Sequence, residues 1–233
     1  ELQQTIAARR SVRSRLVELL KNEAGKIAEN ANITPATTRD LAQSFLESRQ
    51  AGFRVGFLFT QGKTEEERKR RLEAFYTDFS NHVTAQILWH VKDAVKKQGL
   101  SLGLDEKAVE EAAELVRADL TPEWLVSKVR SGAVVTGEYV LNYSKEIANE
   151  VRTAVKRSAG SAAERLADAA EARYAQEMPA LLAELEALEE ELAHRRELAA
   201  LEASERETQE HLNSFIREAE TLAAKEVPFP QLS

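Results

Sequence analysis

Gly62, Lys63 and Thr64 are residue types that bind nucleotide phosphates, and they follow an apolar run. In a P-loop, backbone N–H groups wrap the phosphates, the lysine reaches the terminal phosphates and the Ser or Thr hydroxyl holds Mg²⁺. The motif also needs a glycine about five positions before its second glycine. Phe57 stands there, and Gly56 is one residue too far away. A bulky Phe57 would keep the backbone from approaching phosphate, so the spacing argues against a nucleotide site.

The charges after Thr64 argue in the same direction. Glu65, Glu66 and Glu67 place three carboxylates where the helix of a P-loop attracts phosphate. A local explanation accounts for them. Thr64 and Glu67 match the T-x-x-E capping box, so we expect Thr64 to be the N-cap of a helix whose first turn carries acids that suit the helix dipole.

Other chemically active side chains form no convincing cluster. His82 and His90 are two helical turns apart, whereas a metal site needs closer ligands and a facing carboxylate, so we expect helix-surface or interhelical histidines. The chain has no Cys, which excludes thiol chemistry. The basic run Lys69–Arg71 follows acids at helical pairing distance. The sequence therefore predicts no catalytic residue, no bound cofactor and no metal ligand in this segment.

The composition favours long helices. Of 233 residues only 9 are Gly and 5 are Pro, while 30% are charged, so few turns divide a highly charged chain. Between Ser161 and Glu226 there are 17 acidic and 7 basic residues, which leaves 25 basic and 22 acidic residues elsewhere. No basic excess of the size that binds nucleic acid is present. We predict an all-α fold, an elongated antiparallel multi-helix bundle with long helices.

Apolar residues at three- and four-residue spacing predict where these helices lie. We expect helices over residues 1–31, from Thr34 as N-cap and Pro35 to Arg49, over 64–98, in two short stretches capped by Asp105 and Thr121, over 139–176 with a break at Gly160, and over 180–226 after a kink or restart at Pro179. Leucines of the last helix follow a heptad-like rhythm that falters at Arg195 and resumes at Leu212.

Two glycine-containing apolar loops interrupt the helices, near residues 51–62 and 131–138. The first holds Phe57, Leu58 and Phe59, a candidate hinge or partner contact. The second adjoins candidate membrane-contact residues, which are Trp124, Leu125, Lys128, Val129, Arg130, Val134, Val135 and Tyr139. A loop with Trp, Tyr, Lys and Arg at the tip of a helical rod could dip into a bilayer. The alternative is that these side chains pack into the end of the bundle.

Residues 30–79, "QILWHVKDAVKK" at 86–97 and "GEYVLNYSKEIANEV" at 137–151 resemble the helical part of bacterial dynamin-like GTPases. The resemblance implies a helical neck and trunk, a GTPase head joined at the neck and a membrane-touching tip. It implies a parent protein that self-assembles and remodels or fuses membranes on GTP hydrolysis, with GTP and Mg²⁺ bound in a domain missing from this segment. The expected partners are that GTPase domain, further copies of the chain and a membrane surface, at the cytoplasmic, inner face of the cell membrane.

On this resemblance we expect a single helical stalk domain, 1–233, with neck-like helices and an apolar loop (1–62), trunk helices with a candidate tip at 120–141 (63–160) and acidic return helices (161–233). Its predicted role is non-catalytic: self-assembly, lever motion and membrane contact. Two alternatives stay open, a coiled-coil scaffold or adaptor with no membrane role and an enzyme whose site no motif reveals. A deep pocket with convergent polar groups would favour the enzyme.

Overall fold

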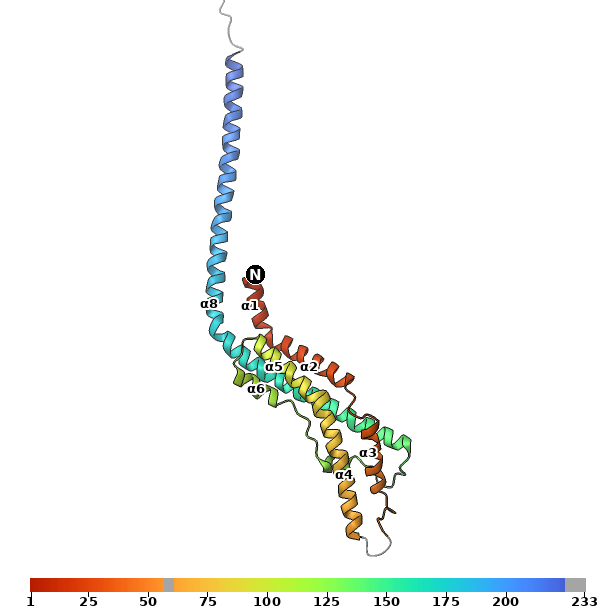
Figure 1. Cartoon of the computed structure of the whole chain (residues 1–233). Helices are drawn as coiled ribbons and strands as arrows, with labels where there is room; N and C mark the ends of the chain where they lie inside the picture. Colours follow the sequence, from red (N-terminus) through yellow and green to blue (C-terminus); the bar gives the residue numbers. More distant parts are fainter. Residues whose placement is uncertain (57–60, 225–233) are drawn as a thin grey trace, which may run out of the picture. The chain divides into compact units, whose positions relative to one another are not determined.

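The computed structural model describes residues 1–56 and 61–224 (Figure 1). These residues form helices and their connections without any strand, which confirms the predicted all-α helical bundle. The helices are α1 (Leu2–Arg10), α2 (Val12–Asn30), α3 (Ala36–Ser48), α4 (Gln61–Val83), the π-helix η1 (Thr84–Leu88), α5 (Trp89–Ser101), α6 (Glu106–Glu114), α7 (Pro122–Ser127) and α8 (Gly137–Ala223). Contacts divide the chain into two compact units: Ala7–Gln176, and Glu1–Ile6 together with the chain from Glu177 onward.

The core of the unit Ala7–Gln176 is built on α4, η1 and α5, which follow one another without a break (Figure 1). Every fourth residue along them is buried, namely Phe75, Phe79, Val83, Ile87, Val91 and Val95. In an α-helix, residues four apart are rotated by about 40°, so this spacing would soon leave one face of the helix. The wider π-helical turn offsets part of that rotation and keeps the six side chains on the core.

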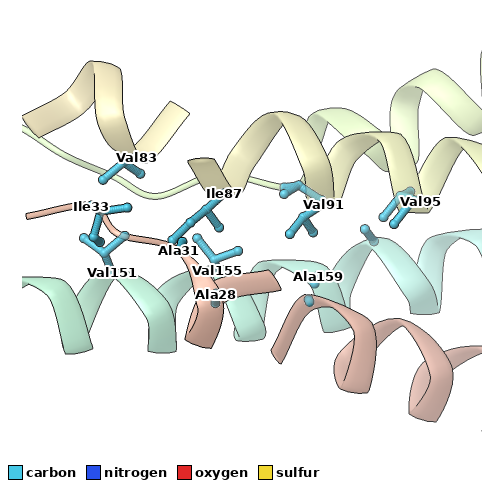
Figure 2. Packing of buried hydrophobic residues seen from close by; sticks show 14 of the residues in the cluster. Ala28, Ala31, Ile33, Val83, Ile87, Val91, Val95, Val151, Val155 and Ala159 are labelled. Carbon is cyan, nitrogen blue, oxygen red and sulfur yellow. The ribbon is translucent and has the colours of Figure 1, made fainter. Parts of the chain in front are cut away.

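Val83 and Ile87 meet small and β-branched residues from the turn after α2 and from α8 (Figure 2). Figure 2 shows Val83 near Ile33 and Val151, and Ile87 near Ala31 and Val155. Each of these residues is almost completely buried. Many buried side chains of α8 are alanine or valine, so the helices can approach closely there and fill the space at the density of a protein interior.

Glycines and lysines let α2 and α8 pack side by side. Gly25 of α2 faces the aliphatic end of Lys156, and Gly160 of α8 faces that of Lys21. Lys156 Nζ also pairs with Glu29 of α2 at 2.8 Å. The break predicted at Gly160 is therefore wrong. The glycine lies inside α8, because its missing side chain leaves room for the lysine stem of the neighbouring helix.

Arg13 fastens the start of α2 to α8. Its guanidinium lies 2.5 Å from Glu164, 2.5 Å from Asp168 and 2.7 Å from Glu171. The hydrogen bond from Arg13 holds the pKa of Glu171 below its ordinary value. These groups are partly exposed, so water screens the pairing and each pair contributes little to stability. The cluster gives Arg13 three acidic partners on α8.

Two predicted helix caps are confirmed. Asp105 accepts hydrogen bonds from the N–H groups of Lys107 and Ala108 at the start of α6. Thr121 accepts from the N–H of Trp124 at 3.1 Å, with Pro122 at the first position of α7. At the end of α5, Gly103 has a φ of 67° and its N–H donates to Leu100 O, which is the left-handed cap that glycine tolerates best.

Other predicted boundaries are corrected by the structure. The N-cap of α3 is Pro35 and not Thr34, and it has no side-chain cap bond. Thr64 is not the cap of α4, because that helix begins at Gln61; the Thr64 hydroxyl accepts from the N–H of Val55 at 3.1 Å. The N-terminal helix is two helices separated at Ser11, and Pro179 lies within α8, which continues through it.

We predict that Gly99→Ala destabilises the bundle. An added Cβ would come within 2.6 Å of Val109 Cγ2 and 3.1 Å of Leu166 Cδ2, and valine has little freedom to move aside. Overpacking costs about 1–3 kcal/mol, more than the roughly 1 kcal/mol that alanine gains over glycine in a helix.

The matched control is Gly62→Ala in α4, where an added Cβ meets nothing within 4 Å. Urea denaturation should show a lower midpoint for the Gly99 variant and an unchanged or higher midpoint for the Gly62 variant. Equal midpoints for the two variants would contradict the packing argument.

Candidate functional site

Leu125 anchors the segment from α7 to the start of α8. Its side chain is completely buried, and its carbonyl accepts a hydrogen bond from the Tyr143 hydroxyl at 2.8 Å. Burial raises the pKa of Tyr143 well above its ordinary value, so the phenol keeps its proton and remains a donor. α7 is thereby fixed to α8 from inside the bundle, and Leu125 belongs to the core.

Lys128 and Trp124 are held against the side of α8. The Lys128 ammonium pairs with Glu150 at 2.6 Å and lies 5.6 Å from the centroid of the Trp124 ring. Trp124 is half-buried and packs against the core. Both residues therefore have protein partners, and the cation–π contact shields one face of the indole ring.

The connection between α7 and α8 is an ordered loop that presents Val134 to solvent. The N–H of Arg130 donates to the Tyr139 hydroxyl at 2.9 Å, and Gly132 takes a left-handed φ of 74°. Thr136 accepts from the N–H of Tyr139 at the start of α8. These bonds fix both ends of the loop, and Val134 between them is 72% exposed. An apolar side chain held in water by an ordered backbone is a candidate contact residue.

This loop lies beside the end of α3. A hollow of about 480 Å³ is lined by Arg49, Gln50 and Ala51 on one side and by residues of 126–139, among them Val129, Arg130, Val134, Val135 and Tyr139, on the other. The segment that leads toward the first apolar loop is thus next to the second. Phe57, Leu58 and Phe59 lie outside the described residues.

Two arginines of α4 fasten the end of α3. Arg68 Nε donates to Ser48 O at 2.9 Å and Arg71 donates to Ser44 O at 3.0 Å, which satisfies carbonyls at the negative end of the helix dipole. Arg71 also lies 4.9 Å from the Phe53 ring centroid. Sequence spacing predicted only the intrahelical pairing, which Arg70 and Arg71 do make with Glu67. The contacts of Arg68 and Arg71 with α3 depend on how the two helices pack, so the local sequence around the arginines does not predict them.

The candidate residues from 124 to 139 thus separate by exposure. Leu125 is in the core, whereas four others are half-buried and pack against it: Trp124, Val129, Val135 and Tyr139. Arg130 and Val134 are on the surface, and Arg130 has Glu146 at 3.8 Å. The surface that can meet another molecule is therefore centred on Val134 with arginines around it.

The residues that suggested nucleotide or metal binding are either exposed or engaged in contacts within the bundle. Gly62 and Lys63 are exposed in the first turn of α4. His82 contacts Asp78, whose carboxylate accepts from the buried Thr38 hydroxyl at 2.5 Å. Across residues 1–56 and 61–224, no group of His, Asp and Glu side chains has the arrangement to hold a metal ion.

One exposed aromatic residue was not singled out by sequence reasoning. Trp89, the first residue of α5, is 61% exposed and lies edge-on to His90 with ring centroids 4.9 Å apart. It directly follows the π-helical turn. The sequence did contain a signal for this irregular turn. The buried stripe keeps an unbroken four-residue spacing, which an α-helix alone cannot hold on one face.

Comparison with known proteins gives one informative match. The chain is 32% identical over 190 residues to Dynamin-like protein A of Bacillus subtilis (strain 168), an alignment that covers 82% of the chain. The chain spans only 16% of the length of that relative. No family model matches the chain, and no solved structure matches it.

We predict that Leu125→Ala destabilises the chain and that Val134→Ser does not, because Leu125 is buried and Val134 is exposed. Removing a buried leucine side chain costs about 2–5 kcal/mol, so the Leu125 variant should lose stability and order around α7. Val134→Ser removes only exposed apolar atoms and should stay within about 0.5 kcal/mol of the native chain. Thermal unfolding followed by circular dichroism measures both, and a large loss for the Val134 variant would show that the loop packs elsewhere.

Proposed function

Because the chain belongs to the bacterial dynamin-like family, we propose that it is the non-catalytic helical stalk of a larger membrane-remodelling GTPase. In this proposal GTP and Mg²⁺ bind in a separate domain of the parent protein. The stalk transmits motion from that domain, contributes surfaces for self-assembly and contacts the inner face of the cell membrane. The identity over 190 residues supports the family, and the helical bundle suits the mechanical role.

One observation carries the membrane-contact part of the proposal. Val134 is presented to solvent by a loop whose ends are fixed, and Arg49 and Arg130 line the adjoining hollow. An apolar residue flanked by arginines suits the boundary between acyl chains and anionic headgroups, where the arginine heads remain hydrated. No helix among the described residues has the length and apolar character needed to cross a bilayer.

The size of this contact also bears on self-assembly. Full burial of one valine side chain stabilises a contact by about 1.5–3 kcal/mol, less than the roughly 4 kcal/mol of a millimolar complex. A single Val134 loop would therefore bind a membrane weakly. Several stalks held together would bind much more tightly, because the second and later contacts are intramolecular. The proposed assembly and the proposed membrane contact thus depend on each other.

A coiled-coil scaffold is the second candidate, and a separate observation favours it. The later part of α8 exposes large apolar residues, among them Leu198, Leu201 and Phe215. A scaffold would use these residues to bind another helix and would have no use for the Val134 loop. Lipid binding therefore discriminates the two candidates.

We predict that the chain co-sediments with vesicles of mixed phosphatidylglycerol and phosphatidylcholine and that Val134→Asp reduces the bound fraction. Losing the insertion of one valine should lower the apparent affinity roughly tenfold or more. Leu100→Asp is the control, since Leu100 is an exposed leucine at the end of α5, away from the loop. If the native chain stays in the supernatant, or if both variants lose binding equally, the loop is not the membrane contact.

A further inference from the structure

Two arginines of α4 hold the end of α3, which packs along α4 (Figure 1). Arg68 donates to Ser48 O, a carbonyl that the helix leaves without a partner at its end. Arg71 donates to Ser44 O one turn earlier. The side chain of Arg68 is 26% exposed and that of Arg71 is 25% exposed, so both bonds are partly shielded from water. We name this pair of bonds the arginine clasp.

The clasped end of α3 is connected through the core to the loop before α8. Phe45 follows Ser44, and its ring centroid lies 6.3 Å from that of Tyr143. The ring of Phe75 in α4 lies 5.7 Å from Phe45 and 6.2 Å from Tyr143. All three rings are buried, and the Tyr143 hydroxyl donates to Leu125 O. Because the rings are close-packed, a displacement of Phe45 is transmitted to the bond that fixes α7.

The same end of α3 also meets the loop nearer the surface. Leu46 is 1% exposed and lines the hollow together with Val129 and Val135. Within the loop the backbone bonds are local, such as that from Ala133 N–H to Arg130 O at 3.3 Å. A segment held by short-range bonds takes much of its order from its neighbours and opens together with them.

The arginine clasp lies at the base of the first apolar loop. Arg71 is 4.9 Å from the centroid of the Phe53 ring, on the chain that leaves α3. The Thr64 hydroxyl accepts from the N–H of Val55, which joins that chain to the first turns of α4. The residues that close this base therefore include one of the two arginines that hold α3.

We propose that the end of α3 (residues 44–50) and the segment 126–139 open as one cooperative element, which the arginine clasp keeps closed. Proteins open locally in such contiguous elements. Any event at the base of the first apolar loop that withdraws Arg68 and Arg71 loosens the backbone that presents Val134, without contacting Val134. In this way α3 is a relay between the two apolar loops.

Tyr76 provides a different route from α4 to the same region. Its hydroxyl donates to Leu120 O at 3.3 Å, shortly before α7 begins. This distance is long for an O–H donor, whereas the route through α3 consists of buried, close-packed rings. The bond of Tyr76 therefore contributes less, and its removal distinguishes the two routes.

The test measures hydrogen exchange in the whole chain by mass spectrometry, in peptides that cover 44–50, 126–139 and, as a reference in α2, 16–28. The clasp variant combines Arg68→Met with Arg71→Met, which removes the donors and keeps an apolar stem. The matched control is Arg70→Met, because Arg70 also pairs with Glu67 but its side chain is 73% exposed. No lipid is present, so the outcome is independent of the proposed membrane contact.

We expect the clasp variant to speed exchange in 44–50 and in 126–139 to a similar extent, by at least roughly fivefold, because two charge-assisted bonds are lost. Exchange in 16–28 should not change, and Arg70→Met should leave all three peptides unchanged. Tyr143→Phe, which removes the bond to Leu125, should speed exchange in the same two peptides.

A double-mutant cycle tests the coupling directly. When the clasp variant and Tyr143→Phe are combined, the acceleration in 126–139 should be at least about twofold below the product of the two separate accelerations, since each change already opens the shared element.

Four results would overturn the proposal. The clasp variant could speed exchange in 44–50 alone, or in 16–28 as much as in 126–139, which would mean a local effect or a general loss of stability. The two accelerations could multiply, which would make the two sites independent. Tyr76→Phe could by itself reproduce the effect of the clasp variant on 126–139, which would assign the coupling to α4 and Leu120 instead of α3.

Discussion

The bundle depends on the burial of one stripe of side chains at strict four-residue spacing, from Phe75 to Val95. All six members are buried although an α-helix would rotate the stripe away from a single face. The π-helical turn at Thr84–Leu88 reconciles the spacing with the helix. The turn uses the wider hydrogen-bond pattern of a π-helix, and Trp89 directly after it is exposed to solvent. It keeps one continuous buried surface against which α2, α6 and α8 pack.

Small residues on the partner helices complete this arrangement. Alanines and Gly160 of α8, together with Gly25 of α2, allow backbones to come close while lysine stems cover the contacts and keep their ammonium groups in water. The loop at Val134 gains its order from this packing, since Leu125 and Tyr143 fix its base in the core. The exposed position of Val134 therefore depends on the buried contact between Leu125 and Tyr143.

The acidic residues of α8 differ between its earlier part, in the bundle, and its later part. Where α8 packs in the bundle, its acids have partners, as Glu171 has in Arg13 and Glu150 in Lys128. Beyond Glu189 the acids have few basic neighbours, and leucines emerge beside them. One helix thus supplies both the core of the bundle and a stretch of exposed acidic and apolar side chains.

The sequence by itself determined the helices, because apolar spacing and capping chemistry act over a few residues. The all-α class, the helix end at Arg49 and the caps at Asp105 and Thr121 could all be predicted in this way. Tertiary packing decided the rest. It kept Gly160 in a helix, turned Thr64 toward Val55, buried Leu125 while exposing Val134, and brought the end of α3 to the loop before α8. These outcomes depend on which side chain arrives from a distant helix, and spacing within one segment carries no information about that neighbour.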